Sequence, residues 1–302
     1  MDFVVQASHI PAPGETVLGR GFKTFPGGKG ANQAIACARA GGEATEMLVA
    51  LGDDAFAVQI EKSLHAANVH MHTVRVAEQS TGTAFICVSD NGENAITVAP
   101  GANSALRASH LPALAGCSHL MLQLETPLET VLAYARAARS EAVTVVLNAA
   151  PAQKLPAELL ALIDVLVVNA NELGALTDDR GTIFEGLQHI AVPCVIVTLG
   201  DRGCCAREGG VFFVQPAFPV ASIDTTAAGD TFCGALVARL AKKETLKLAM
   251  RFASAAGALA CTKLGAQSSI PTHVEVETFL RKAPSTVVAQ ELALRTFSGF
   301  TQ

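Results

Sequence analysis

The sequence predicts an α/β fold in which helices cover both faces of a mostly parallel central sheet. Short apolar, β-branched segments alternate with amphipathic helical patterns along most of the 302 residues, and this alternation is typical of parallel sheets. Half of the residues are hydrophobic and only 16% are charged, so the chain can bury a large core. We therefore expect a single domain over residues 1–302, built as a three-layer sandwich.

Each main element has a local signal. Residues 31–40 are alanine-rich, and Gly41 and Gly42 predict the end of that helix. Residues 47–50 predict a buried strand, and apolar residues at every fourth position predict an amphipathic helix over 55–67. Further strands are expected at 119–124, 143–147, 165–168 and 194–197, and further helices from Pro127, over 229–241 and over 245–261.

Two regions interrupt this alternation. Residues 4–25 are rich in Pro, Gly and Thr, and residues 71–99 contain three apolar stretches with a turn signal at 90–93. We expect both regions to form a small β lid that stands off the main sheet. Because ligands of α/β proteins bind beyond the carboxyl ends of the strands, such a lid would cover the site.

Charge and composition exclude several classes of partner. The net charge is −5 and there is no basic run, which disfavours binding to nucleic acid or to an anionic membrane surface. No stretch approaches the ~18 apolar residues of a membrane span, and Pro11, Pro13 and a first basic residue at Arg20 argue against a signal peptide.

Eight cysteines without a C-x-x-C pair indicate reduced, mostly buried thiols and a cytoplasmic location. Cys204 and Cys205 are expected on opposite faces of one strand, with redox sensitivity as the alternative. His70 and His72 could chelate a metal ion if both lie on one face of a strand. The sequence shows no third ligand for them.

The first motif that carries chemistry is the glycine-rich segment 27–34, directly before a helix. Its glycines allow a close approach of backbone to a ligand, and the helix start supplies free N–H groups. Lys29 and Asn32 add polar side chains. The pattern matches neither a P-loop nor the G-x-G-x-x-G fingerprint, and a tight turn before a helix is the alternative explanation.

The second motif is the segment 224–235, in which small residues lead into a helix. The amides of residues 227–230 could form an anion-binding nest at the positive end of that helix. Asp230 would lie beside the bound phosphoryl group, where a carboxylate can accept the proton of an attacking hydroxyl. The alternative is that Asp224 and Asp230 only cap the helix.

Together the two motifs resemble the signatures of the ribokinase family of carbohydrate kinases, the PfkB type. The resemblance extends from about residue 2 to about residue 282 and includes segments 13–16, 82–84, 100–103, 123–125, 148–152, 197–200 and 265–269. It implies a ribokinase-like fold with a β lid, and an ATP-dependent kinase that phosphorylates a sugar hydroxyl.

The resemblance also implies a role for each matching residue. Asp230 would be the catalytic base, and Ala227, Ala228 and Gly229 the anion hole. The sugar would be bound by Asp2, Gly27, Gly28, Lys29, Asn32, Glu125 and Asp230. The nucleotide would contact Asn169, Thr198, Leu199, Gly200, Asp201, Arg202, Gly203, Gly229 and Ser254. Glu172 of the N-x-x-E motif would hold Mg²⁺ through water, and an activating K⁺ would lie among Asp224, Thr226, Ala260, Lys263, Gly265 and Ser269.

The implied reaction is transfer of a phosphoryl group from ATP to O5 of D-ribose. The near alternative is a kinase for deoxyribose, another sugar or a nucleoside. A truncated, non-catalytic sugar-binding homologue is the other alternative, because the family has a central strand before the segment of Asp2 and we expect that strand to be missing here. The resemblance further implies a homodimer paired through the lids. The tail 283–302 has no family counterpart, and we expect it to form a docking helix or to pack on a partner chain.

Overall fold

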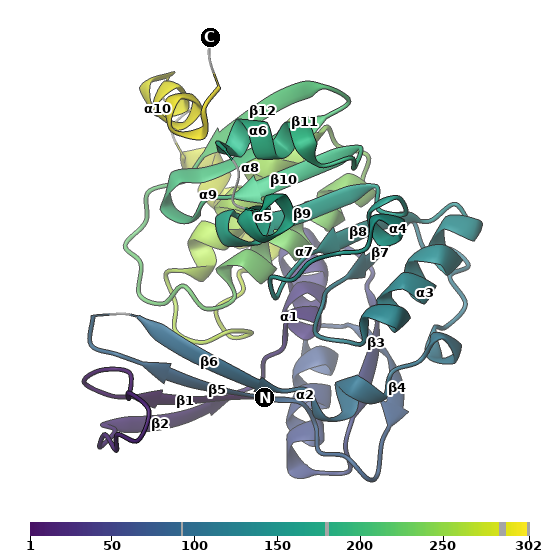
Figure 1. Ribbon diagram of the computed structural model, residues 1–302, viewed down its shortest axis with the longest axis vertical. Coiled ribbons are helices and arrows are strands. Elements are labelled where there is room, and N and C mark those ends of the chain that lie inside the picture. The colour runs from purple at the N-terminus through teal and green to yellow at the C-terminus, as the bar shows by residue number, and fades with distance from the viewer. Residues whose placement is uncertain (92, 179–180, 284–287, 301–302) are drawn as a thin grey trace.

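The computed structural model describes residues 1–302 except 92, 179–180, 284–287 and 301–302. Its main sheet has six strands in the order β12-β11-β10-β9-β8-β7 (Figure 1). Strands β7 to β10 are parallel, and β11 and β12 add antiparallel strands at one edge. The bounds are β7 His119–Leu122, β8 Thr144–Asn148, β9 Val165–Asn169, β10 Cys194–Thr198, β11 Gly203–Glu208 and β12 Val211–Pro216. The predicted α/β class is confirmed.

Helices cover both faces of this sheet and enclose two apolar cores. The first core contains side chains of α1 (Lys29–Ala36), α2 (Ala55–Ala66), α7 (Ala228–Ala241), α8 (Leu246–Ala260) and α9 (His273–Lys282). The second contains side chains of α3 (Leu128–Ser140), α4 (Ala157–Leu160), α5 (Ala170–Thr177), α6 (Ile183–His189) and α10 (Val288–Ser298). Cys204 belongs to the first core and Cys205 to the second, so the two thiols lie on opposite faces of β11, as predicted.

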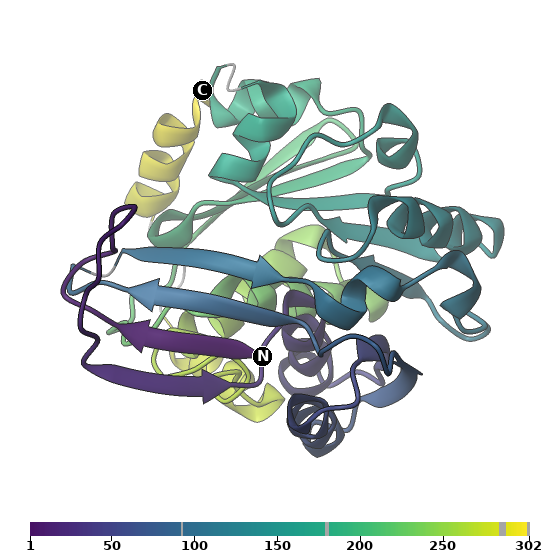
Figure 2. The ribbon, with the colours of Figure 1, turned by 60° about the horizontal axis from the view of Figure 1, so that its bottom comes forward.

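The remaining strands form two smaller sheets. One has the order β2-β1-β5-β6 and consists of β1 (Asp2–Gln6), β2 (Gly21–Phe25), β5 (Thr83–Val88) and β6 (Asn94–Ala99). Figures 1 and 2 show that it stands apart from the main sheet. The other is a parallel pair of β3 (Glu46–Leu51) and β4 (His70–Arg75).

This arrangement corrects the expected lid ranges. The range 71–99 begins inside β4, which pairs with β3 because the two strands and α2 between them form a β-α-β unit. The four-stranded sheet begins at Asp2 rather than at residue 4. Strands β5 and β6 pair as the expected hairpin, although Gly92 of the predicted turn lies outside the described residues. The described residues do not test the expectation that the family's central strand before Asp2 is missing.

Several predicted boundaries shift by one or two residues. The strand expected over 119–124 ends at Leu122, and the helix expected from Pro127 begins one residue later. The first helix begins at Lys29 and continues as a π-helical turn over Cys37–Gly41. Gly42 follows it at a φ of 73°, in the left-handed conformation expected of a helix end.

Close packing of α1 on α7 depends on a glycine. A Cβ on Gly234 would lie 2.2 Å from the backbone oxygen of Gln33 and 2.7 Å from the Cβ of Ala36. Such distances are below van der Waals contact, so only glycine lets the two backbones approach this closely. The first turns of α1 and α7 are thereby placed side by side.

The tail forms a docked helix, α10. Leu294 and Ser298 are buried, and Phe300 packs against Phe184 and Phe212 with ring centroids 5.1 and 5.5 Å apart. Residues 284–287 and 301–302 of the tail lie outside the described residues. Within the described part of the chain, no helix has the length and apolar character needed to cross a membrane.

Candidate active site

The carboxylate of Asp230 is held between two helices. It lies in the first turn of α7 and is 9% exposed. Asn32 Nδ2 donates a hydrogen bond to its Oδ2, and Gln33 Nε2 donates to its Oδ1, each at 2.9 Å. Both donors lie on α1, so the carboxylate has a fixed orientation and each oxygen keeps a lone pair for another donor. The alternative in which Asp230 only caps its own helix is wrong, because the N-cap of α7 is Ala227 and receives no side-chain hydrogen bond.

Gln33 is a site residue that the sequence analysis missed. It is buried, and its Nε2 also donates to Asn148 Oδ1 at 2.9 Å. Its Oε1 accepts a hydrogen bond of 2.6 Å from Gln123 Nε2. These amides connect the carboxylate of Asp230 to strand β8 and to the segment after β7. The only sequence signal for Gln33 was its place beside Asn32 in the glycine-rich motif.

Of the four amides expected to form an anion hole, one is already hydrogen-bonded within the loop before α7. Ala227 has a φ of 57°, which reverses the chain before α7, and the amide of Ala228 donates to the oxygen of Thr225 at 3.2 Å to close that turn. The amides of Gly229 and Asp230 lie in the first helical turn, where a helix offers no backbone acceptor. A Cβ on Gly229 would meet no atom within 4 Å, so the backbone faces open space at this residue.

The residues expected around the sugar converge from four segments of the chain, which are Asp2, residues 27–32, Glu125 and Asp230. The amide of Lys29 donates to Glu125 Oε2 at 3.0 Å. A Cβ on Gly27 would lie 2.0 Å from Oδ2 of Asp2, so a side chain at residue 27 would displace this carboxylate. Gly28, the N-cap of α1, has a φ of 96° and open space at its Cβ position. Its backbone is therefore accessible to a ligand.

In this cluster the positive charges of Lys29 and of the amino terminus oppose several carboxylates. Burial raises the pKa of Asp2 and of Glu125; the charge of Asp230 adds to both shifts and that of Lys29 opposes them. Burial alone would lower the pKa of Lys29, but the carboxylates of Asp230, Glu125 and Glu172 outweigh it and raise the pKa. Lys29 therefore stays charged in the middle of the cluster.

Asn169 and Glu172 form a reciprocal cap at the start of α5. The amide of Glu172 donates to Asn169 Oδ1, and the amide of Asn169 donates to Glu172 Oε2, both at 2.8 Å. Burial raises the pKa of Glu172, while the hydrogen bond from Asn169 and the charge of Lys29 oppose the shift. The N-x-x-E motif thus has a structural role, and a carboxylate–water–Mg²⁺ contact is compatible with it because the cap uses Oε2 alone.

A cavity of about 290 Å³ lies at the carboxyl ends of β9 and β10, where the nucleotide was expected. It is lined by Asn169, Ala170, Asn171, Thr198, Leu199, Gly200, Arg202 and Phe297. A neighbouring cavity of about 210 Å³ is lined by Asp201, Arg202, Pro216, Ala217, Gln290, Ala293, Leu294 and Phe297. The guanidinium of Arg202 lies 3.9 Å from the ring centroid of Phe297. Phe297, on the tail helix α10, had no sequence signal.

Three of the expected nucleotide residues line neither cavity: Gly203, Gly229 and Ser254. Gly203 begins β11, where a Cβ would lie 2.1 Å from the oxygen of Gln215, so its glycine serves strand packing. The hydroxyl of Ser254 lies 3.7 Å from the thiol of Cys204.

The loops expected around a monovalent cation also meet. Asp224 accepts hydrogen bonds from the amide and hydroxyl of Thr226 at 2.9 and 2.6 Å, and from the amide of Gly265 at 2.9 Å. Burial acts to raise the pKa of Asp224, but these hydrogen bonds outweigh it and lower the pKa. The side chain of Lys263 instead pairs with Glu275 on α9.

Ala260 and Ser269 complete this region. Ala260 is buried at the end of α8, and the hydroxyl of Ser269 donates to the backbone oxygen of Ala266 at 2.8 Å. The contacts of the described residues thus join the loop of Asp224 and Thr226 to Gly265, while Ser269 bonds within its own turn.

Comparisons with known proteins identify the family of the chain. Residues 1–273 match the pfkB family of carbohydrate kinases. The ribokinase of Haemophilus influenzae is 38% identical over 295 residues, which cover 93% of this chain and 96% of that protein. The crystal structure of Thermotoga maritima ribokinase has a TM-score of 0.84 at 35% identity and covers 93% of this chain and 96% of its own. The structure of Arabidopsis thaliana ribokinase complexed with ribose and ATP has a TM-score of 0.84 at 30% identity, with the same coverage. The chain therefore belongs to the pfkB family of carbohydrate kinases.

Proposed function

We propose that this chain transfers the γ-phosphoryl group of ATP to O5 of D-ribose. The observation that carries the proposal is the Asp230 carboxylate, held by Asn32 and Gln33 beside the first-turn amides of α7. The names of its relatives support ribose as the acceptor and ATP as the donor. A coupled ADP assay with ribose, deoxyribose and ribonucleosides tests the choice of acceptor; a chain that binds sugar without turnover would be a non-catalytic homologue.

The site suggests how the transfer proceeds. Asp2, Lys29 and Glu125 would bind the sugar hydroxyls and place the 5-hydroxyl in line with the γ-phosphorus. That oxygen forms the new P–O bond while the bond to the β–γ bridging oxygen breaks, and ADP leaves. Asp230 accepts the hydroxyl proton. The amides of Gly229 and Asp230 stabilise the charge that develops on the transferred group.

Two cations fit residues of this chain. Mg²⁺ would neutralise charge on the phosphate oxygens, and Glu172 would hold it through water, since Mg²⁺ prefers oxygen ligands and keeps several waters. Oxygens near Asp224, Thr226 and Gly265 would hold K⁺ and order the loop that leads into the anion hole. Assays in which Na⁺ replaces K⁺ test the second assignment.

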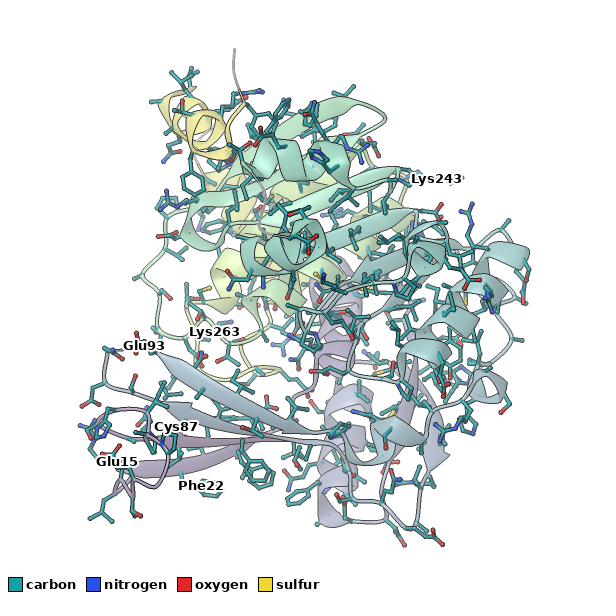
Figure 3. The ribbon with its side chains drawn as sticks, viewed as in Figure 1. Glu15, Phe22, Cys87, Glu93, Lys243 and Lys263 are labelled. Atoms are coloured by element: carbon teal, nitrogen blue, oxygen red, sulfur yellow. The ribbon has the colours of Figure 1, made fainter. Side chains whose placement is uncertain are left out.

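We propose that the four-stranded sheet is a lid and also the dimer contact. Phe3 stacks on Phe22 and Phe85, with centroids 6.1 and 5.3 Å apart. Phe22 and Phe85 are 64% and 54% exposed, and Figure 3 shows Phe22 on the side of the sheet that faces away from the main body. An exposed apolar face of this kind is typical of an interaction surface.

A reducing, cytoplasmic environment is also part of this proposal. All eight cysteines are free thiols, and burial raises the pKa of Cys194 and of Cys204 to about 12. Such thiols are poor nucleophiles, which suits a compartment where disulfides do not form.

The lid contact predicts a homodimer that Phe85→Asp converts to a monomer, because a charge on this face would be buried at the interface. Sedimentation velocity measures both states. Lys243→Asp, at an exposed position outside the sheet, is the control and leaves the dimer intact. A wild-type monomer at assay concentrations would contradict the proposal.

Replacing the base removes the proton acceptor and keeps the shape of the site. We expect Asp230→Asn to lower kcat by roughly 10²–10⁴-fold with little change in ribose affinity. The coupled assay gives kcat, and calorimetry gives the affinity. Asp53→Asn, at an exposed carboxylate, is the control. Unchanged turnover in Asp230→Asn would remove Asp230 from the mechanism.

The raised pKa of Glu125 predicts a pH-dependent gain of stability in Glu125→Gln. Because the pKa is raised on folding, the protonated carboxyl of Glu125 stabilises the folded state. This contribution to the free energy of unfolding is fully present below the ordinary pKa of about 4.3, and it is lost as the pH rises through the raised, folded-state pKa. Without substrate, the variant is therefore more stable than wild type at pH 7, and the difference shrinks as the pH falls toward about 4.3. Urea unfolding between these pH values measures it, and a variant less stable at pH 7 would refute it.

The position of Phe297 in the cavity predicts that replacing this residue changes the KM for ATP and not the KM for ribose. If the adenine base stacks on Phe297, Phe297→Ala raises the KM for ATP roughly 5- to 150-fold, since stacking of a base on an aromatic ring contributes about 1–3 kcal/mol. The KM for ribose stays constant. Phe297→Trp retains the wild-type value, and Leu292→Ala, at an exposed position of the same helix, is the control. Equal ATP KM values in all four proteins would place the base elsewhere.

A further inference from the structure

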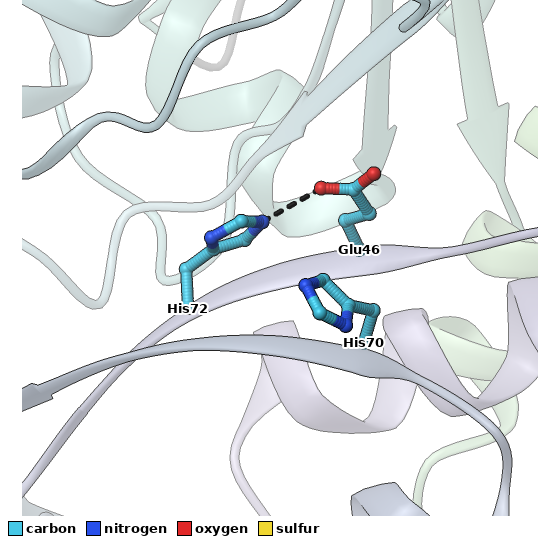
Figure 4. Close-up of side chains that lie close together, drawn as sticks. All are labelled: Glu46, His70 and His72. Atoms are coloured by element: carbon cyan, nitrogen blue, oxygen red, sulfur yellow. Dashed lines mark hydrogen bonds and ion pairs between the residues drawn. The ribbon is translucent and has the colours of Figure 1, made fainter.

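A cluster of potential metal ligands lies at the amino-terminal ends of β3 and β4 (Figure 4). Glu46 is the first residue of β3, and His70 is the first residue of β4. The active site described above lies beyond the carboxyl ends of the sheet strands, so this cluster occupies the opposite end of its own strand pair. No part of the proposed phosphoryl transfer uses these residues.

The strand pairing explains why the three side chains meet. His70 and His72 are two residues apart on β4 and therefore point to the same face. Glu46 is the direct ladder partner of His70, so its side chain lies on that face too. The sequence showed the two histidines, but it did not show which residue of another strand would lie opposite them.

The donor atoms are close to the spacing that a metal ion needs. One ligand atom from each of the three residues lies within 4.8 Å of the other two. His72 Nε2 lies 2.6 Å from Glu46 Oε2, and the two imidazole rings have centroids 5.0 Å apart at an angle of 84°. Ligands of a tetrahedral Zn²⁺ ion lie about 3.3 Å apart, from bond lengths of about 2.0–2.1 Å.

The required movement is therefore below an ångström for the closest pair. Glu46 and His72 have to separate by about 0.7 Å to reach that ligand spacing. Their side chains are 54% and 31% exposed, and His70 is exposed as well. Rotation of these side chains can supply the movement without a change in the backbone.

We propose that Glu46, His70 and His72 bind one divalent transition-metal ion, with the remaining coordination positions taken by water. Two imidazoles and one carboxylate favour Zn²⁺, Ni²⁺ or Co²⁺ over Mg²⁺ or Ca²⁺, which prefer oxygen ligands throughout. The ion ties the start of β3 to the start of β4. Because it binds the folded chain and not the unfolded one, it stabilises the fold by mass action.

Another histidine–carboxylate pair in this chain, His9 and Glu15, has no second histidine beside it among the ligand groups of the described residues. His9 Nε2 lies 2.8 Å from Glu15 Oε1 on the exposed loop between β1 and β2. A histidine–carboxylate pair of this kind forms a hydrogen bond but supplies only two metal ligands. His9→Ala is therefore a matched control for His72→Ala.

The test is a calorimetric titration with NiCl₂ alone, using chelator-treated, fully reduced protein without nucleotide. The full-length wild type is expected to bind one equivalent of Ni²⁺ at this site and to show a higher Tm in its presence. His70→Ala, His72→Ala and Glu46→Gln each weaken that binding by about tenfold or more and lose the Tm shift. His9→Ala keeps both. The unfolding temperature of each variant without metal checks that it is folded.

Three outcomes would overturn the assignment. The first is the absence of saturable Ni²⁺ binding by the wild type, and the second is equal binding by the wild type and the His70 and His72 variants. The third involves Cys117, whose pKa is raised by burial and by the nearby charge of Glu46. Loss of binding in Cys117→Ser, but not in His70→Ala, would place the ion on that thiol. ATP turnover in Mg²⁺ is unchanged in all these variants, so the result is independent of the proposed kinase activity.

Discussion

The contact on which the site depends is the pair of hydrogen bonds that Asn32 and Gln33 donate to Asp230. The donors and the acceptor are almost two hundred residues apart in the chain, so only the packing of α1 against α7 brings them together. That packing requires Gly234, where any side chain would overlap the backbone of α1. A glycine in the helix interior lowers helix propensity, but it allows the close approach of α1 that positions the Asp230 carboxylate.

The same packing has an electrostatic cost. Asp2 and Glu125 have raised pKa values because they are removed from water close to Asp230. Lys29 compensates part of this charge, and its amide also binds Glu125. The unliganded site therefore contains carboxylates that would be more favourably solvated outside it. Sugar hydroxyls can donate to these oxygens, so part of the solvation lost on folding is recovered on binding. The carboxylates that would increase affinity for the sugar therefore lower the stability of the unliganded fold.

The C-terminal helix α10 forms part of the cavity at the carboxyl ends of β9 and β10. Burial of Leu294 and Phe300 anchors α10 on the second core, and this places Phe297 over Arg202. The match to the carbohydrate kinase family ends at residue 273, so one wall of the cavity consists of residues outside the family match. Residues outside that match thus contribute directly to the geometry of this cavity.

Much of the architecture was accessible from local pattern. Alternation of apolar strands and amphipathic helices predicted the α/β class, and two glycine-containing motifs predicted which helix starts would line the site. Local sequence could not place β4 beside β3, because period-2 patterning describes one strand and does not specify its partner. For the same reason it could not show Glu46 opposite His70, Gln33 between Asn148 and Asp230, or Phe297 over Arg202. Backbone propensity and the spacing of apolar residues depend on neighbours along the chain. The sequence alone therefore determined the helices, the strands and the positions of the motifs. Contacts between distant segments depend on how whole layers pack, and only the tertiary structure decided them.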